Sequence, residues 1–383
     1  MRIILVGGGV TNCLLGICLK RYYGNNADVL IFEKNNELLK KLSVTGNGKC
    51  NILNKNFNNG LIIKDDELRK VFNSYSYEDL KGFYNELGLP LFEKDDYVYP
   101  FSESANQVRS LLINKLEEYG VEVHLDSKIN NFYKKDNKFY VETEKYSGSA
   151  EILIISTGGK SYKVLGSDDS ILEILKKQGH KVKDFKPGLC AIKVKENVNK
   201  LDGVRCRAKV TLYHENKKVF EEAGEVLFKK NALSGIVIFN LSLFLATNFT
   251  NFNNLKISIN FVDGYEDLEV ISQKYAGSAA FLNSFVNKKL ADYIEKTANN
   301  DINKALKLIQ CLEFKPTDFY PFDYAQISVG GIELSEINRS FESKIYSNLY
   351  FGGEILDISG YCGGFNLSIC LICALEIFKS IIA

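Results

Sequence analysis

The chain has 383 residues, more than a single hydrophobic core usually supports, so two or three domains are expected. Hydrophobic residues make up 45% of it and charged residues 25%, which is the composition of an ordinary soluble globular protein. Its 48 Lys and Arg residues almost balance its 47 Asp and Glu residues, so the overall charge gives no support for a nucleic-acid-binding protein, which would more often be clearly basic.

The N-terminal residues predict a β–α–β unit. Residues 2–6 form a short apolar run that ends in GGG, and residues 10–23 carry apolar side chains at helical spacing before a glycine that stops the helix. Residues 28–32 are a second apolar strand, closed by Glu33. A unit of this kind builds a parallel sheet.

The remaining chain predicts one α/β domain interrupted by an insertion. The predicted elements are a helix at 108–119, strands at 120–129, within 132–144 and at 151–159, alternating strands with few helices over 187–263, mainly helical residues over 265–312, strands at 325–334 and 348–356, and an apolar final helix at 367–383. Glu376 and Lys379 interrupt the final helix and leave it too short an unbroken apolar run to span a membrane, so we expect it to be buried.

The residues GGGVTN, 7–12, match the start of a dinucleotide-binding fingerprint. Gly7 and Gly9 permit a tight turn and let backbone N–H groups approach a pyrophosphate at a helix N-terminus. Asn12 stands where the third glycine is usual. Glu33, at the end of the second strand, is placed to accept hydrogen bonds from ribose hydroxyls. We therefore expect a bound dinucleotide. Because no second fingerprint occurs in the sequence, NAD(P)H, if used, would visit the site only transiently.

Residues 42–54, LSVTGNGKCNILN, pack poorly as a helix or a strand, which raises the question of what they lie against. The block KKLSVTGNGKCNILN, 40–54, is one of several that resemble a known family. The others are STGGKSYKVLGSDD (156–169), GEVLFKKNALSG (224–235), AQISVGGIEL (325–334) and LYFGGEILDISGYCGGFNL (349–367). With these blocks the chain resembles, nearly end to end, the BaiN/YhiN-like NAD(P)/FAD-dependent oxidoreductases, which are also described as aminoacetone oxidase family FAD-binding enzymes.

The sequence departs from the family pattern at four places. Asn12 replaces a glycine, Lys49 an arginine and Lys163 a proline, and KKNA at 229–232 replaces T-H-T-G. The change at 229–232 falls in the segment expected to face the substrate. The substrates of the family are therefore the property that transfers least directly to this chain.

The resemblance implies non-covalent FAD, with loop TGNGKCN lining the flavin ring. The residues expected at the cofactor are Gly7, Gly9, Asn12, Glu33, Lys41, Thr45, Gly46, Gly48, Asn51, Val123, Thr157, Gly158, Gly159, Gly353, Glu354, Asp357, Gly363, Gly364, Phe365 and Asn366. Val123 would reach the adenine through its backbone. The final helix, opening at 363–366, would point partial positive charge at the pyrimidine end of the flavin and stabilise its reduced, anionic form.

Two residues of the loop are candidate catalytic residues. Cys50 would donate a proton after hydride transfer, and Lys49 would hold the reduced ring or an anionic group of the substrate. The alternatives are a small buried residue for Cys50 and a solvated surface charge for Lys49. Cys362, in the C-terminal block, is a second candidate for the thiol.

The predicted fold is α/β: a discontinuous Rossmann-like FAD-binding domain with an inserted β-barrel-like segment and a small helical segment. The boundaries are 1–188 for the first part of the FAD-binding domain, 189–264 for the β-rich insertion, 265–315 for the helical segment, and 316–383 for the return through the β-rich domain and the second part of the FAD-binding domain. The insertion is expected to cap the substrate.

The resemblance implies reduction of an activated C=C bond, either uridine to dihydrouridine in ribosomal RNA, which we slightly prefer, or a bile-acid-like small molecule. Oxidation of an amine-like small molecule and a non-catalytic redox sensor are the alternatives. The RNA reading requires a basic patch, for which Arg205, Arg207, Lys229 and Lys230 are candidates.

We expect no metal, since the three histidines are scattered. Nine cysteines without a disulfide-framework spacing, and too short an apolar run before the glycines for a signal peptide, predict a cytoplasmic protein. The sequence does not predict an oligomeric state.

Overall fold

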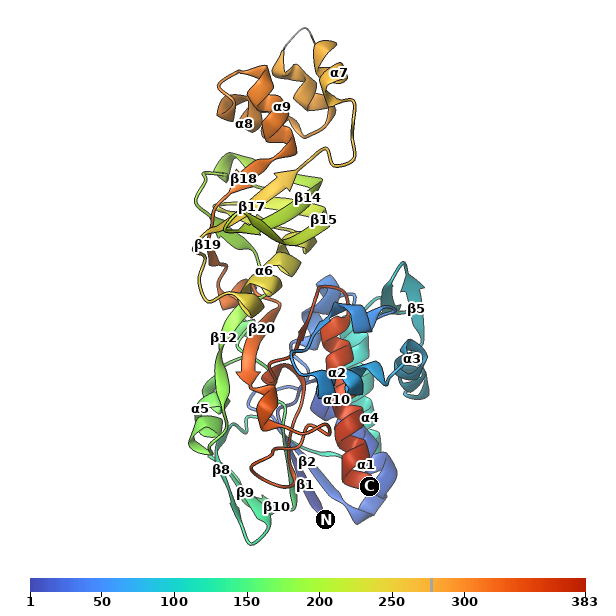
Figure 1. Ribbon diagram of the computed structural model, residues 1–383. Helices are drawn as coiled ribbons and strands as arrows, with labels where there is room; N and C mark the ends of the chain where they lie inside the picture. The colour runs from blue at the N-terminus through green and yellow to red at the C-terminus, as the bar shows by residue number, and fades with distance from the viewer. Residues whose placement is uncertain (276–277) are drawn as a thin grey trace. The chain divides into compact units, whose positions relative to one another are not determined.

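The structure is a computed structural model that describes residues 1–275 and 278–383. The chain forms two compact units, coloured along the chain in Figure 1. Unit 1 comprises Met1–Lys186 and Ile327–Ala383, and unit 2 comprises Pro187–Gln326. Each unit has its own hydrophobic core.

The core of unit 1 is a five-stranded parallel sheet. Its order is β21 (Leu349–Phe351), β11 (Ile152–Ile155), β1 (Arg2–Val6), β2 (Asp28–Phe32) and β7 (Glu122–His124). Every neighbouring pair is parallel. Strand β1 is central, and its Ile3, Ile4 and Leu5 are fully buried because the sheet is covered on both faces. The predicted α/β Rossmann-type fold is confirmed.

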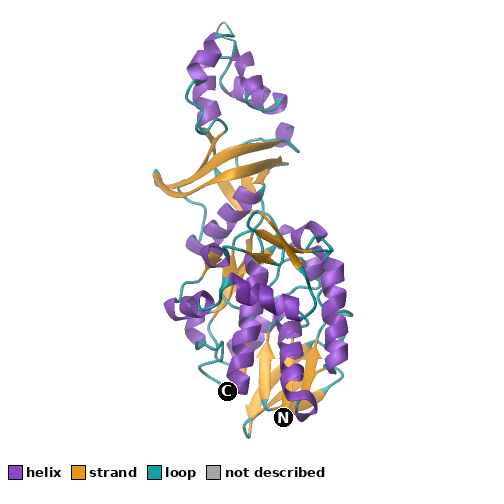
Figure 2. Cartoon of the chain, turned by 90° about the vertical axis from the view of Figure 1, so that its right-hand side faces the viewer, coloured by secondary structure: helices purple, strands orange, loops and turns teal. Residues whose placement is uncertain are grey.

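Three helices of unit 1 pack together beside this sheet: α1 (Val10–Tyr23), α4 (Ala105–Tyr119) and α10 (Phe365–Ile382) (Figures 1 and 2). Helix α4 begins three residues before the predicted start, because the Ser104 side chain accepts a hydrogen bond from the Gln107 N–H and caps the helix there. Helix α10 is long and apolar enough to cross a membrane by length and composition alone. It packs on α1, and Leu371, Ile372 and Cys373 are fully buried, so in this fold it is a core helix.

The other elements of unit 1 surround this centre. A three-stranded antiparallel sheet of β8 (Ile129–Lys135), β9 (Lys138–Thr143) and β10 (Ser147–Ala150) contacts β1 and β11. The remaining elements are β3 (Leu53–Asn54), β4 (Leu61–Ile62), α2 (Asp66–Asn73), α3 (Tyr77–Glu86), β5 (Leu91–Lys94), β6 (Tyr97–Pro100), α5 (Ser170–Lys177), β12 (Val182–Gly188, whose last two residues belong to unit 2), β20 (Ile327–Ile332) and β22 (Ser359–Gly360). Strand β3 pairs with β6, and β6 with β5, so the chain after the predicted flavin loop is tied to a hairpin.

Unit 2 is built on a seven-stranded antiparallel sheet. Its order is β18 (Leu312–Phe314), β17 (Leu255–Asn260), β14 (Arg205–His214), β15 (Lys217–Lys229), β16 (Ala232–Ser234), β13 (Ile192–Val194) and β19 (Pro316–Phe319). Its helices are α6 (Ile236–Asn248), α7 (Leu268–Gln273), α8 (Lys288–Thr297) and α9 (Ile302–Gln310). Helix α6 falls in a region predicted to be mainly strands. It is apolar on nearly every side and largely buried, so the 3.6-residue periodicity that reveals a surface helix is missing from its sequence.

Candidate flavin site

The glycine loop after β1 forms the cradle expected for a pyrophosphate. Gly7 has φ +102°, and a Cβ there would lie 2.4 Å from the Ser156 carbonyl oxygen, so no other residue fits. Gly9 is the N-cap of α1, and among the described residues no side chain caps this helix end. Its first-turn N–H groups are therefore available to an anionic ligand.

Glu33, the predicted ribose acceptor, lies against this loop. Its buried carboxylate accepts hydrogen bonds from the Gly8 N–H at 2.6 Å and from the backbone and side chain of Asn35 at 2.8 and 2.7 Å. Two carboxylate oxygens offer about four acceptor positions, so one remains for a ribose hydroxyl. The side chain holds the loop and presents an acceptor at the same time.

Asn12, one of the departures from the family pattern, is buried and supports the glycine loop. Its Nδ2 donates to the carbonyl oxygens of Val6 at 2.9 Å and Gly7 at 2.8 Å. The asparagine side chain thus satisfies two loop carbonyls from inside the protein. A direct contact between Asn12 and the cofactor stays a prediction.

The loop at 42–54 is irregular, as its composition suggests. Residues Leu42–Gly48 form a kinked 3₁₀ segment in which Thr45 has extended backbone angles. Positive φ angles occur at Gly46, Asn47, Gly48 and Cys50. In the side-chain orientation that satisfies its hydrogen bonds, the Asn51 Nδ2 donates to the carbonyl oxygens of Leu53 at 2.9 Å and Val98 at 3.1 Å. These bonds hold the end of the loop against strand β6.

The two candidate catalytic residues have different surroundings. Cys50 is fully buried, and this burial raises the pKa of its thiol to about 12, against a smaller opposing effect of a hydrogen bond with Thr45. Lys49 is exposed and forms an ion pair with Glu103 at 3.0 Å. These surroundings are equally compatible with a small buried packing residue at Cys50 and a solvated surface charge at Lys49. The catalytic roles of both residues therefore stay predictions.

The N-terminus of α10 lies directly against the end of the loop. A Cβ at Gly364, which has φ +90°, would lie 2.4 Å from the Leu53 carbonyl oxygen. The Asn54 side chain donates to the Gly363 carbonyl at 2.9 Å. Asn366 exchanges hydrogen bonds with the backbone N–H and C=O of Gly360, at 2.9 and 2.8 Å. The structure therefore brings together two segments that the family blocks assign to the flavin.

A third group of predicted residues meets at Glu354. Its carboxylate pairs with the Lys41 ammonium at 2.7 Å and accepts from the Ser328 N–H at 2.9 Å and the Ser161 hydroxyl at 3.2 Å. A Cβ on Gly159 would lie 2.5 Å from the Glu354 Oε1 atom, so this residue must be small. Ser161 and Ser328 were not among the predicted residues, although both lie inside the quoted sequence blocks.

The remaining predicted residues border the same region or its edges. Thr157 follows β11, and its buried Oγ1 has no hydrogen-bond partner within the described residues. A Cβ on Gly353 would lie 2.7 Å from the Thr11 Oγ1 atom. Asp357 forms an ion pair with Lys183 at 2.5 Å, and Val123 lies on the edge strand β7.

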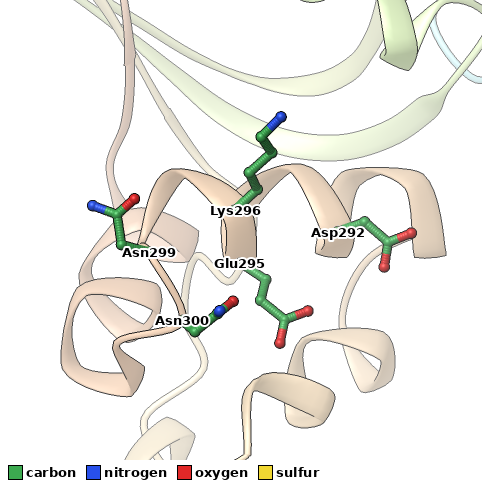
Figure 3. A pocket seen from close by; sticks show the side chains of 5 residues that line it. All are labelled: Asp292, Glu295, Lys296, Asn299 and Asn300. Atoms are coloured by element: carbon green, nitrogen blue, oxygen red, sulfur yellow. The ribbon is translucent and has the colours of Figure 1, made fainter.

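Unit 2 carries a shallow pocket lined only by polar side chains. Asp292, Glu295, Lys296, Asn299 and Asn300 line it, on and after α8, as Figure 3 shows. It shares no residue with the region described above. Over residues 1–275 and 278–383, no group of three or more His, Cys, Asp and Glu side chains is placed to hold a metal ion.

The residues of unit 1 fit FAD. Gly7 and Gly9 form a cradle at an uncapped helix end, Glu33 offers a ribose acceptor, and Thr157 leaves a buried hydroxyl for a ligand. The uncapped N-terminus of α10 supplies a second site of partial positive charge beside loop 42–54.

A family model and two curated proteins match this chain over most of its length. A family model described as the HI0933-like protein Rossmann domain matches residues 1–377. A 3-dehydro-bile acid delta(4,6)-reductase from Clostridium scindens is 28% identical over 393 residues, covering 96% of this chain and 95% of that protein. A ribosomal RNA dihydrouridine synthase from Escherichia coli is 23% identical and covers 88% of both chains.

Among solved structures, the 3-ketosteroid-delta4-(5alpha)-dehydrogenase from Rhodococcus jostii RHA1, in complex with 4-androstene-3,17-dione, has a TM-score of 0.53 at 12% identity. This match covers 99% of this chain and 96% of that one and shows a likeness of fold. The expected family resemblance is confirmed, because the family model spans almost the whole chain. The chain belongs to the HI0933-like family of Rossmann-type, FAD-dependent oxidoreductases.

Proposed function

We propose that this protein reduces a C=C bond conjugated to a carbonyl group in a small molecule, with FAD as the cofactor and NAD(P)H as the transient electron donor. The observation that carries the proposal is the end-to-end similarity to a reductase whose name specifies double bonds in a 3-dehydro (3-oxo) bile acid. The flavin site supports the proposal, because the residues that build it come from the blocks shared with the family.

FAD, when bound, supplies the hydride that adds to the alkene. The protein's part is to hold the ring and the substrate and to exclude water. The backbone N–H groups at the start of α10 place partial positive charge beside Leu53 and Gly363, where they would stabilise negative charge on the ring. The Lys41–Glu354 pair fastens loop 42–54 to the segment that precedes α10.

Reduction of the alkene also needs a proton on the second carbon, and Cys50 is our candidate donor. Burial raises the pKa of its thiol to about 12, so the thiol stays protonated at neutral pH. A thiol of this pKa is still far more acidic than the C–H bond that forms, so the transfer is favourable. Lys49, after exchanging its partner Glu103, would hold the reduced ring.

Reduction of uridine in ribosomal RNA is the second candidate. It is the same reaction type, since the uracil C=C bond is also conjugated to a carbonyl, and the E. coli relative carries that name. The predicted basic patch is its weak point. Arg205 pairs with Glu225 at 2.7 Å, and Glu225 lies directly opposite Arg207 across the strands. The partial neutralisation of these cations leads us to rank the RNA substrate below a small molecule.

The test is a direct assay with both substrate classes. The FAD-loaded protein is incubated with NADPH or NADH and either 4-androstene-3,17-dione or ribosomal RNA from cells lacking this gene. Mass spectrometry then measures a gain of two hydrogens in the steroid or dihydrouridine in the RNA. A saturated steroid product supports the small-molecule proposal. Dihydrouridine that forms with the wild-type enzyme, and not in its absence, would assign ribosomal RNA as the substrate instead. If neither product forms, both candidate functions are overturned.

A further inference from the structure

The hairpin of β5 and β6 carries an aromatic face. Its residues are Phe92, Tyr97, Tyr99 and Phe101, and we call this set the aromatic face below. Phe92 and Tyr99 are cross-strand partners with ring centroids 5.9 Å apart, and Phe92 lies 5.6 Å from Phe101. Phe101 is 67% exposed. The other three residues are half-buried, and a partly exposed aromatic cluster of this kind is typical of a surface that binds something.

The opposite face of the hairpin is already used by the protein core. Leu91, Val98 and Pro100 alternate with the aromatic residues along the strands and are buried. Register alone therefore directs the aromatic side chains away from the core of unit 1. Packing within the unit accounts for Tyr97, which lies against Gly363, but it does not account for the exposure of Phe101.

The aromatic face is continuous with the flavin site. A Cβ on Gly363 would lie 2.8 Å from the Tyr97 ring, and Asn54, whose side chain binds Gly363, is the strand partner of Tyr97. At the other end, burial raises the pKa of Tyr99, and the charges of Lys49, on the flavin loop, and of its partner Glu103 act on this pKa in opposite directions. The rings thus extend from the start of α10 along the flavin loop.

The charges around the hairpin indicate which kind of ligand the aromatic face would bind. Lys49 pairs with Glu103 at 3.0 Å, whereas the pairs of Lys55 and Lys81 with Glu93 belong to the opposite face, since Glu93 is the strand partner of Val98. The hairpin turn adds Asp95 and Asp96 beside Lys94. Aromatic platforms that bind single-stranded nucleic acid lie in positively charged grooves. Here carboxylates offset the lysines, so the surroundings favour an uncharged ligand over a polyanion.

We propose that the aromatic face of the β5–β6 hairpin is the subsite that receives the flat, apolar, uncharged ring system of the substrate. The inference rests on the proposed function, and it narrows the substrate to a small molecule larger than the conjugated group that reacts. Stacking on Tyr97, Tyr99 and Phe101 would remove apolar surface from water and orient the alkene toward the flavin.

Two acceptors with the same reacting group test this subsite in the FAD-loaded enzyme. The ring system of 4-androstene-3,17-dione would extend along the aromatic face, whereas 2-cyclohexen-1-one is too small to reach it. The variants are Phe101→Ala and Tyr99→Ala, with Phe101→Leu as a milder change. Tyr22→Ala, which removes an aromatic side chain that is 56% exposed on α1, is the matched control. Perturbation of the oxidised flavin spectrum gives the steroid Kd without turnover, and product formation gives kcat/KM for both acceptors.

We expect Phe101→Ala and Tyr99→Ala to raise the steroid Kd about tenfold or more, with cyclohexenone turnover and FAD content unchanged and Tyr22→Ala equal to wild type. Equal steroid Kd values in the wild type and both variants would overturn the subsite, even if the enzyme reduces both acceptors. A variant that loses FAD is replaced by Phe101→Leu for the same comparison. If the steroid binds at the aromatic face and neither acceptor is reduced, the subsite stands and the proposed function fails.

Discussion

Lys41 and Glu354 are 313 residues apart in the chain and form an ion pair with 2.7 Å between the Lys41 Nζ and the Glu354 Oε2 atoms. Both side chains are largely shielded from solvent. Through this contact the entrance of the flavin loop is joined to the segment after β21, and through Glu354 also to Ser161 and Ser328. The pair is therefore a structural link between two distant segments of unit 1 at the candidate flavin site.

The first prediction concerns this pair. Lys41→Met and Glu354→Gln are each expected to lower the free energy of unfolding by about 2 kcal/mol, because each leaves a charged hydrogen-bonding partner without its counterpart. Chemical denaturation of the FAD-free protein measures the change. Lys115→Met, which removes a surface pair with Glu118 of the same 2.7 Å length, is expected to cost under about 0.5 kcal/mol. A Lys41 variant no less stable than the Lys115 variant would contradict the prediction.

The second prediction concerns the adenosine end. Glu33→Gln is expected to weaken FAD binding about tenfold or more, because a neutral amide accepts weaker hydrogen bonds from the Gly8 N–H and from ribose hydroxyls. Titration of the apoprotein with FAD, followed by flavin fluorescence, measures the Kd. Glu117→Gln, an exposed position on α4, is the control and is expected to bind FAD normally. Wild-type affinity in Glu33→Gln would place the adenosine elsewhere.

The third prediction uses two glycines. Gly364→Ala would place a methyl group 2.4 Å from the Leu53 carbonyl at a positive φ, so it is expected to displace loop 42–54 from α10 and to release FAD. Gly82→Ala, within α3 and with no atom within 4 Å of the new Cβ, is expected to gain up to about 1 kcal/mol of stability. The FAD-to-protein ratio after purification and the melting temperature separate the two effects. Full FAD content in Gly364→Ala would show that the contact does not shape the site.

The fourth prediction concerns Cys50. Cys50→Ala is expected to lower turnover about 100-fold with FAD binding intact, since loss of a general acid costs about that much, and Cys50→Ser is expected to recover part of it. The pH profile of the wild type should show no thiol ionisation between pH 6 and 9, because burial raises the pKa of Cys50 to about 12. Unchanged turnover in Cys50→Ala would identify the thiol as a packing residue.

The fifth prediction follows from the buried thiols as a group. Burial raises the pKa of Cys190 to about 11 and that of Cys18 to about 12, from an ordinary value of 9.0. A folded-state pKa above the unfolded value gives stability that is fully present below pH 9 and is lost as the pH rises toward the folded pKa. The free energy of unfolding should therefore be flat across neutral pH and fall above pH 9. Cys190→Ala should reduce the slope there by up to about 1.4 kcal/mol per pH unit, and an unchanged slope would mean that Cys190 ionises freely in the folded protein.

Local pattern predicted the Rossmann core because its signals lie close together in the sequence. The limits of β1, α1 and β2 coincide with those predicted, since apolar periodicity and glycine stops define each boundary. Helix α6 was not predicted, because a helix buried on nearly all sides has no polar face to reveal its period. Strand β7 is shorter than the predicted strand over 120–129, since only Glu122–His124 pair with β2.

The candidate site also combines features that local sequence patterns predict with features that only the fold shows. The family blocks identified Lys41, Glu354, Gly363 and Gly364 individually, and their mutual contacts needed the fold. The bond between Asn54 and Gly363 spans 309 residues, and no local rule sets such a register. The aromatic face was not predicted, because only the structure shows that β5 pairs with β6 and which side of this hairpin the core occupies.

The most direct measurement of the central claim is an anaerobic half-reaction. Enzyme whose FAD has been reduced by light is mixed with 4-androstene-3,17-dione in a stopped-flow instrument, and absorbance near 450 nm is followed. Our account predicts that the oxidised flavin spectrum returns in a single turnover, with one equivalent of saturated steroid formed per FAD. A flavin that stays reduced with the steroid, and with 2-cyclohexen-1-one as well, would contradict it.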